Sequence, residues 1–402
     1  MTNKELIHHR MTRQWITPVA SHLHTPAANH PHPPAANHPH TPAASHPHPL
    51  AANHPHTPAE VVSYLGAVQA QDYAMSKWAV GMRCGNTVHD EVEQAIDQGL
   101  ILRTHVLRPT WHLVHAEDIR WMLALSAPRI RAAGAGQIRS VELNDKIFRR
   151  SGKIIEKALA KDKHLTRTEL MSRLGSAGIA TNDIRAAYIM MWAEIDGLVC
   201  NGPRKGKQFT YALLEQRVPP VPTLSRDESL ARLALRYFSS HGPATIHDFA
   251  WWAGLLLSDA KKGMETSGSH WHTIAIGEKK YWLVDPSSSS PATGMPATPS
   301  GKRPGSSAAA HLLPAFDELI VSYTDRSALF DAATERLVVT NNGLFRPSIL
   351  VDGKVIGCWS RTERSGKITI TQNLFQPVGK RAGQAIAAAC KRYQAFMGKS
   401  AR

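Results

Sequence analysis

The stretch "SGKIIEKALAKDKHLTRTELMSRLGSAGIATNDIRAAYIMMWAEIDGLVCNGPRKGKQFTYALL", residues 151–214, predicts three helices followed by a hairpin. The first helix repeats apolar side chains at helical spacing: Ile154, Ile155, Ala158 and Leu159. A second helix is predicted from Thr166, because Thr166 and Glu169 form the Thr-x-x-Glu pattern of a capping box. The third helix is expected to direct these side chains inward: Ile184, Ala187, Tyr188, Met191 and Ile195.

The hairpin that follows has the strands "GLVCN" and "QFTYALL" and the tip "GPRKGK". Its tip carries the cations Arg204, Lys205 and Lys207. Three helices followed by a basic hairpin are typical of a winged helix, in which a helix enters a DNA groove and the wing contacts phosphates. The third helix offers only Arg185 on its outer side, so we interpret this unit as a structural copy that no longer reads bases.

Similar patterns on both sides predict two further units of this kind. In residues 227–284 a helix, a Gly-Pro break, a helix near Thr245, a helix after Ser258 and alternating strand residues follow one another. Before residue 151, a helix capped at Thr57 precedes another helix, two strands and a helix entered at His115.

These patterns predict an α+β, mainly helical fold of tandem winged-helix units packed with a C-terminal β-barrel or sheet. Turns are expected at Asp352-Gly353 and Ser365-Gly366 of the last segment, which ends in a basic helix. The predicted segments are a first unit over 1–150 with a flexible His/Pro insert over 21–58, units over 151–220 and 221–285, a linker over 286–310, and the C-terminal segment over 311–402.

Composition excludes several classes of protein. No segment approaches about 18 uninterrupted apolar residues, and the N-terminus lacks the apolar core of a signal peptide, so we expect a cytoplasmic, nucleoid-associated protein without a membrane partner. The four cysteines are far apart, which predicts neither a disulfide framework nor a CxxC metal site. The 47 Lys and Arg against 32 Asp and Glu give a net charge of +15, which favours a nucleic-acid partner over a generally basic enzyme.

A low-complexity insert begins at Thr25 and consists of four eight-residue units such as "TPAANHPH". Their prolines and lack of apolar periodicity predict a flexible loop. Histidines at this density suit transition metals, but a repeat expansion without an ordered backbone is the stronger interpretation, so no metal site is predicted.

The hairpin of the first unit carries the basic side chains Arg103, Arg108 and His112, with His105 between them. They are candidates for contacts with DNA phosphates or a lesion. The alternative is that Arg103 and Arg108 pair with acids such as Asp97 or Glu117.

The stretch "LGAVQAQDYAMSKWAVG", residues 65–81, holds two carboxamides, Gln69 and Gln71, on either side of an alanine. Neither side chain is acidic, basic or nucleophilic. The residues by themselves leave open whether the glutamines cap backbone groups or bind a water or substrate.

Five stretches together resemble the AlkZ-like family of winged-helix DNA glycosylases: "LGAVQAQDYAMSKWAVGMR", "GLILRTHVLRPTWHLVHAEDIRWMLALSAPR", "DFAWWAGL", "LLPAFDELIVSY" and "LFRPSILVDGKVIGCW". The resemblance implies tandem winged-helix units packed around a β-barrel, with a concave DNA-binding channel. The family's motif of glutamine, aliphatic residue, and glutamine or aspartate corresponds to Gln69, Ala70 and Gln71.

The resemblance implies that Gln69 and Gln71 are catalytic and that the partner is double-stranded DNA with alkylated bases. Two carboxamide oxygens would hold the water that attacks once a cationic base leaves. Asp72 is interpreted as a helix cap or ion-pair acid. We expect a monomer that needs no cofactor.

Two departures from the family pattern leave the lesion open: Pro109 stands where many relatives have glycine, and the His/Pro insert precedes the motif. The rival class is a winged-helix DNA-binding protein or transcription regulator without chemistry. A weaker rival is a small-molecule hydrolase using His112, but no Gly-x-Ser-x-Gly pattern is present.

Deleting residues 25–56 should leave folding and base release almost unchanged, because the repeats lack charge and apolar periodicity. Melting temperature and excision rate of the deletion variant would be compared with those of the full chain. A large drop in melting temperature, or lost activity restored by zinc, would contradict this expectation.

Overall fold

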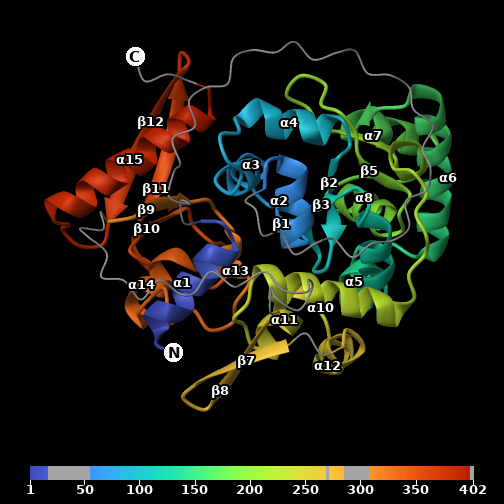
Figure 1. Cartoon of the computed structure of the whole chain (residues 1–402). Coiled ribbons are helices and arrows are strands. Elements are labelled where there is room, and N and C mark those ends of the chain that lie inside the picture. Colours follow the sequence, from blue (N-terminus) through green and yellow to red (C-terminus); the bar gives the residue numbers. More distant parts are fainter. Residues whose placement is uncertain (17–54, 269–270, 285–307, 399–402) are drawn as a thin grey trace, which may run out of the picture.

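The computed structural model describes residues 1–16, 55–268, 271–284 and 308–398. Most of the predicted His/Pro insert and of the predicted linker lies outside these ranges. Within them the chain combines helices with small antiparallel sheets, which confirms the predicted mixture of the two (Figure 1). No helix in the described part is long and apolar enough to cross a bilayer.

The first part of the chain builds a three-stranded sheet in the order β1-β3-β2 near the middle of the molecule (Figure 1). Thr57 starts a helix with a capping box to Glu60, as predicted. The elements are α1 (Asn3–Arg13), α2 (Pro58–Leu65), β1 (Val68–Gln69), α3 (Tyr73–Gly81), α4 (His89–Asp97), β2 (Ile101–Val106), β3 (Thr110–His115) and α5 (Ile119–Ser140).

The second part follows the predicted order of three helices and a hairpin. Its elements are α6 (Asp145–Asp162), β4 (Leu165–Thr166), α7 (Arg167–Ser176), α8 (Arg185–Ile195), β5 (Val199–Asn201), β6 (Thr210–Leu213) and α9 (Leu214–Arg217). The capping box of Thr166 with Glu169 is present. Use of this unit as a DNA-binding winged helix stays a prediction.

The predicted inward face of α8 is only partly correct: Ile195 is buried and Tyr188 and Met191 pack against the core, but Ala187 is exposed. Ala186, Ile189 and Met190 are buried, whereas Ile184 precedes the helix and is 46% exposed. The segment is apolar on almost every side, so periodicity alone cannot select the face that packs.

The third part also has the predicted elements: α10 (Arg226–Ser240), α11 (Ile246–Ala253), α12 (Leu257–Thr266), β7 (Trp271–Ile276) and β8 (Lys279–Val284). The apolar face predicted for the first of these helices is buried, with Leu233 and Tyr237 both fully enclosed. Thr245 caps α11 through a capping box with Asp248.

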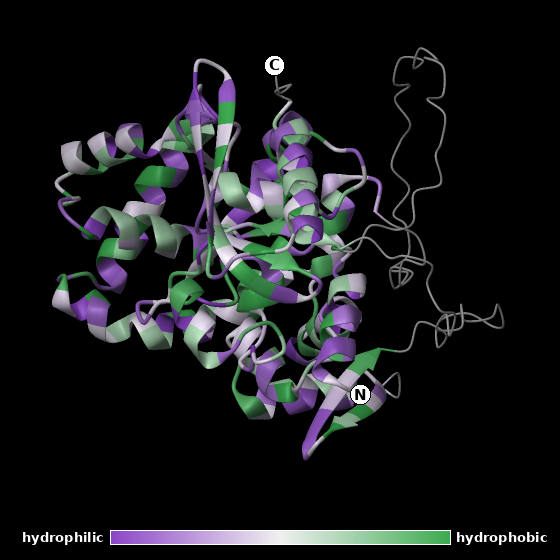
Figure 2. Cartoon of the chain, turned by 90° about the vertical axis from the view of Figure 1, so that its left-hand side faces the viewer, coloured by the Kyte–Doolittle hydropathy of each residue, from purple (hydrophilic) through white to green (hydrophobic). Residues whose placement is uncertain are grey.

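The C-terminal part contains β9 (Ala310–Leu313), α13 (Glu318–Val321), α14 (Ala332–Val338), β10 (Ser348–Val351), β11 (Lys354–Arg364), β12 (Lys367–Leu374) and α15 (Lys380–Phe396). Both predicted turns are present, with positive φ at Asp352-Gly353 and at Ser365-Gly366. The described strands form an open sheet in the order β12-β11-β10-β9 and not a closed barrel, because β9 and β12 are unpaired at its edges. In Figure 2 the hairpin β11–β12 projects from a largely hydrophobic centre and is mostly hydrophilic.

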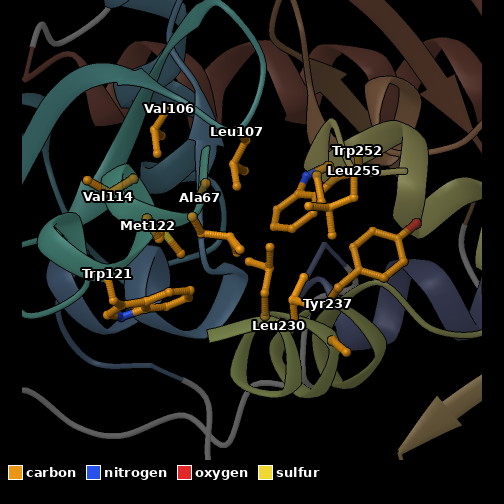
Figure 3. Close-up of a cluster of buried hydrophobic side chains, with 14 of the residues drawn as sticks. Ala67, Val106, Leu107, Val114, Trp121, Met122, Leu230, Tyr237, Trp252 and Leu255 are labelled. Atoms are coloured by element: carbon orange, nitrogen blue, oxygen red, sulfur yellow. The ribbon is translucent and has the colours of Figure 1, made fainter. Parts of the chain in front are cut away.

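A large apolar cluster joins the first part of the chain to the third (Figure 3). Leu107 and Met122 of the first part lie in it with Leu230 and Trp252 of the third. The tip of the hairpin β2–β3 contacts the end of α11 so closely that a Cβ on Gly254 would lie 2.5 Å from the Leu107 carbonyl oxygen. This packing holds the hairpin tip in one position.

A buried ion pair connects the segment just after α3 to the C-terminal part. Arg83 donates two hydrogen bonds of 2.9 Å to the Asp317 carboxylate, and both side chains are fully buried. Arg83 also donates to Gln14 Oε1 (3.0 Å), and the Gln14 amide donates to the Tyr323 hydroxyl (3.1 Å). The network thereby ties the segment after α1 to two distant parts of the chain.

Replacing Arg83 with methionine should lower the free energy of unfolding by about 3–5 kcal/mol, because the Asp317 charge would stay buried without its partner. Urea denaturation followed by circular dichroism measures this decrease. The control Arg131→Ala breaks the exposed pair with Asp196 and should cost at most about 1 kcal/mol. Equal decreases in the two variants would contradict the assignment.

Candidate active site

The two glutamines lie between the helices α2 and α3, in a short edge strand and the residues just after it. Gln69 lies in β1 opposite His112 of β3, and the Ala70 N–H donates to the Trp111 carbonyl at 2.7 Å. Gln69 is the last residue of β1, Ala70 after it is fully buried, and Gln71 follows in a bend of the chain. Gln69 is buried and Gln71 is exposed.

Each carboxamide oxygen is oriented by one donor of the protein. Gln69 Oε1 accepts from Arg108 Nη2 at 2.8 Å, and Gln71 Oε1 accepts from the Trp111 backbone N–H at 3.1 Å. Gln71 therefore caps a backbone group, which is one of the two roles that the sequence left open for the glutamines. An amide oxygen has two lone pairs, so each can still accept a hydrogen bond from a bound group.

Asp72 has the capping role predicted for it. Its carboxylate accepts from the Met75 N–H at 3.0 Å and caps α3. The catalytic roles of Gln69 and Gln71 stay predictions, since the geometry accommodates both roles considered for them.

Polar groups continue across the sheet on the side of Gln69. Thr104 and Gln69 lie opposite His112 on its two neighbouring strands, so the three side chains form a row on one face. Four buried atoms here have no hydrogen-bond partner among the described residues: Thr104 Oγ1, Arg108 Nε, Thr110 Oγ1 and His112 Nε2. A buried face with unmatched donors and acceptors suits a bound polar group.

His112 lies inside this face and not on the surface. Its side chain is fully buried, and Nδ1 lies 3.0 Å from the Thr110 carbonyl, so Nδ1 donates and Nε2 keeps its lone pair. Burial, with the nearby Arg108 charge, lowers the pKa of His112 to about 4. The imidazole is therefore neutral at pH 7, which favours a role as a hydrogen-bond acceptor over the predicted contact with phosphate.

Arg108 lies between Gln69 and an exposed tryptophan. Its guanidinium is 5.6 Å from the centre of the Trp251 ring, whose indole N–H donates to the Val321 carbonyl at 3.1 Å. Trp251 is 46% exposed, while its neighbour Trp252 is buried. Burial lowers the pKa of Arg108 from its ordinary value.

Arg103 is committed to the backbone of the motif. Its Nε and Nη2 donate to the Ala70 carbonyl at 3.2 and 3.0 Å, and its guanidinium lies 4.3 Å from the Trp111 ring centre. Among the described residues, neither Arg103 nor Arg108 forms the ion pair with Asp97 or Glu117 that was the alternative. His105, the fourth basic residue of the hairpin, is buried against Glu194, with Nδ1 2.6 Å from its carboxylate.

The cations of the predicted wing differ in exposure. Arg204 is half-buried and donates to the Lys207 carbonyl at 2.5 Å. Lys205 pairs with Glu169 at 3.1 Å but is 69% exposed, and Lys207 is exposed. Arg185 of α8 donates to backbone carbonyls of Ala180 and Val141. The exposed lysines are therefore the better candidates for contacts with phosphates.

The sequence interpretation missed Glu318. Its Oε1 accepts the backbone N–H of Gln69 at 2.7 Å, and the side chain is fully buried. The available signal was the acidic pair Asp317-Glu318 inside the otherwise apolar stretch "LLPAFDELIVSY". Acids in such a segment are buried only when hydrogen-bonded or paired. The described residues contain no cluster of His, Cys, Asp and Glu suited to a metal ion.

Comparisons with known proteins identify the family of this chain. The family model described as DNA glycosylase AlkZ-like matches residues 62–396. The interstrand DNA cross-link repair glycosylase of Streptomyces sahachiroi is 22% identical over 331 residues, covering 77% of this chain and 84% of that protein. The solved structure of S. sahachiroi DNA glycosylase AlkZ has a TM-score of 0.72 at 18% identity, covers 100% of this chain and 98% of that chain, and shows a shared fold. Because the family model spans most of the sequence, the chain belongs to the AlkZ-like family of DNA glycosylases.

Proposed function

We propose that this protein hydrolyses the N-glycosidic bond of cationic N-alkyl purine nucleotides in DNA, with bulky adducts or crosslinks among its substrates. The observation that carries the proposal is that the carboxamide oxygens of Gln69 and Gln71, two residues apart in the chain, are each oriented by a protein donor. The S. sahachiroi relative is described as acting in interstrand cross-link repair, which supports including crosslinks.

An alkylated purine already carries positive charge and leaves readily. The glycosidic bond then breaks through a state in which the sugar resembles an oxocarbenium ion. A strong general base is unnecessary, and the rate depends on a water held on the correct face of the sugar. The free lone pairs of Gln69 Oε1 and Gln71 Oε1 are suited to hold that water.

The surroundings of the motif favour water positioning over proton abstraction. The carboxylate of Asp72 is occupied by the cap of α3. His112 is neutral and presents Nε2 as an acceptor, which can assist in orienting a water beside Gln69.

Binding of double-stranded DNA is proposed to use the helix-and-hairpin units as tandem winged helices. The exposed wing lysines Lys205 and Lys207 suit phosphate contacts. The same proposal includes the division of the chain into segments 1–150, 151–220, 221–285, 286–310 and 311–402, and a monomeric protein.

Incubation with duplex DNA containing 7-methylguanine, followed by alkali, tests the function directly. Strand cleavage at the lesion reports base release. Tight binding to one unmodified sequence without release would favour the rival, a regulator without chemistry.

Gln71→Ala should lower the single-turnover excision rate by about ten- to a thousandfold, while affinity for lesion DNA changes little. Gln69→Ala should act in the same direction and less than additively, because both side chains would hold one water. Gln71→Asp should recover part of the rate, because a carboxylate is also an acceptor.

The melting temperatures of these variants distinguish a catalytic role of the glutamines from a role in capping backbone groups. Gln94→Ala, which changes an exposed glutamine of α4, is the matched control and should keep full activity. If Gln71 only caps the Trp111 N–H, stability and activity should fall together and Gln71→Asp should not help. Full excision by the double alanine variant would end the catalytic assignment.

Affinity for duplex DNA should fall steeply with salt, because phosphate contacts release counterions. Changing Lys205 and Lys207 together to alanine should reduce the slope of log K against log salt by about one for each phosphate that the wing no longer neutralises. Fluorescence anisotropy at several salt concentrations measures the slope, with Lys261→Ala on α12 as the control. An unchanged slope would mean that the wing faces away from DNA.

A further inference from the structure

Glu318 is a buried acid that contacts the motif itself. Its Oε1 accepts the Gln69 N–H at 2.7 Å. Its Oε2 accepts from the Trp252 indole N–H at 3.0 Å and from the Ser322 hydroxyl at 2.6 Å. Three donors from separate positions of the fold therefore hold one carboxylate behind Gln69.

The preceding residue shows how this carboxylate differs from an ordinary buried acid. Asp317 is equally buried, and Arg83 neutralises it through two hydrogen bonds. Among the described residues, Glu318 has no lysine or arginine within ion-pair distance, and its nearest titratable neighbour is His241, whose Nε2 lies at 3.6 Å. A buried charge without a cationic partner is costly, so a gain elsewhere is expected.

The carboxylate is ionised nonetheless. Burial alone would raise the pKa of Glu318, but His241 beside it and the hydrogen bonds from Ser322 and the Gln69 N–H hold it below its ordinary value. Burial lowers the pKa of His241, so the imidazole does not cancel the charge at pH 7.

The field of this charge reaches the face with the unmatched polar atoms. Glu318 acts on the pKa values of both Arg108 and His112, in the direction that favours their charged forms. Both residues lie beside Gln69. In the protein interior, a charge behind this face acts on any positive charge that develops in front of it.

We propose that Glu318 is a positioning residue for base excision, which holds the backbone of Gln69 and supplies the negative charge that stabilises the sugar cation. This inference rests on the proposed function. The negative charge is supplied by Glu318, which lies outside the motif, because the two polar side chains of the motif are uncharged carboxamides.

The reaction balances without a proton on Glu318. The bond between C1′ and the base nitrogen breaks, and its electron pair stays on the base, which leaves neutral. The oxygen of the water then bonds to C1′, and its proton passes to solvent. Glu318 remains an anion throughout and acts only through its field and through Gln69.

The test compares Glu318→Gln with Glu318→Asp in the full-length protein on duplex DNA containing 7-methylguanine. Glu318→Gln keeps an acceptor for the Gln69 N–H but loses the charge, so its single-turnover rate should fall about ten- to a hundredfold. Affinity for lesion DNA should stay the same, because Glu318 is buried. Glu318→Asp keeps the charge and should be faster than Glu318→Gln.

Asp248→Asn is the matched control, since Asp248 is an equally buried acid that caps α11 and has no hydrogen bond to the motif. It should retain the wild-type excision rate at a temperature where circular dichroism shows every variant folded. Ser322→Ala removes one hydrogen bond from the carboxylate and should slow excision by a smaller factor, which keeps the test usable if Glu318→Gln does not fold.

Two kinds of failure are distinguishable. Wild-type protein that releases no base from the lesion DNA contradicts the proposed function. If the wild-type protein does excise the base, three results would overturn the role of Glu318 and leave the proposed function standing. These are a Glu318→Gln rate equal to that of the wild type, a Glu318→Asp rate no higher than that of Glu318→Gln, or a loss of rate in Asp248→Asn as large as that in Glu318→Gln.

Discussion

The hydrogen bond from the Gln69 backbone to Glu318 is the contact on which the geometry of the site depends. The strand β1 is only two residues long, and its ladder with β3 is too short to hold the motif by itself. Glu318 fixes the N–H of Gln69, and Arg103 fixes the carbonyl of Ala70. The backbone of the motif is thus held from both sides by side chains of other elements.

Buried charge is used in two different ways in neighbouring positions. Asp317 and Arg83 form a neutral pair that joins distant parts of the fold. Glu318 keeps its charge, with hydrogen bonds from neutral donors instead of a cation. The first arrangement stabilises the fold with little field outside the pair, whereas the second directs a field toward Gln69. Trp252, which donates to Glu318, lies in the apolar cluster of Figure 3, and Glu318 itself is fully buried. Little water therefore weakens the field of its charge.

Local sequence patterns predicted most elements correctly, because their signals involve residues a few positions apart. The capping boxes at Thr57 and Thr166 mark the starts of α2 and α7, and the turn at Asp352-Gly353 joins β10 to β11. The packed face of α8 was predicted only in part, because its sequence is apolar on nearly all sides. Of the predicted barrel or sheet, the described strands form the open sheet; the sequence could not choose between the two, because closure depends on whether edge strands meet and not on the pattern of any one strand.

The sequence by itself determined the family resemblance, the paired glutamines and the order of helices and hairpins, since all of these are written in short stretches of residues. The structure decided between the two roles considered for Asp72, a helix cap or an ion-pair acid. Only the tertiary structure decided that the motif is an extended edge, that His112 is buried and neutral, and that Arg103 and Arg108 hold the motif. It also brought Glu318 to Gln69 across 249 positions of sequence. No local periodicity encodes that contact, because it depends on how separate elements pack around a shared core.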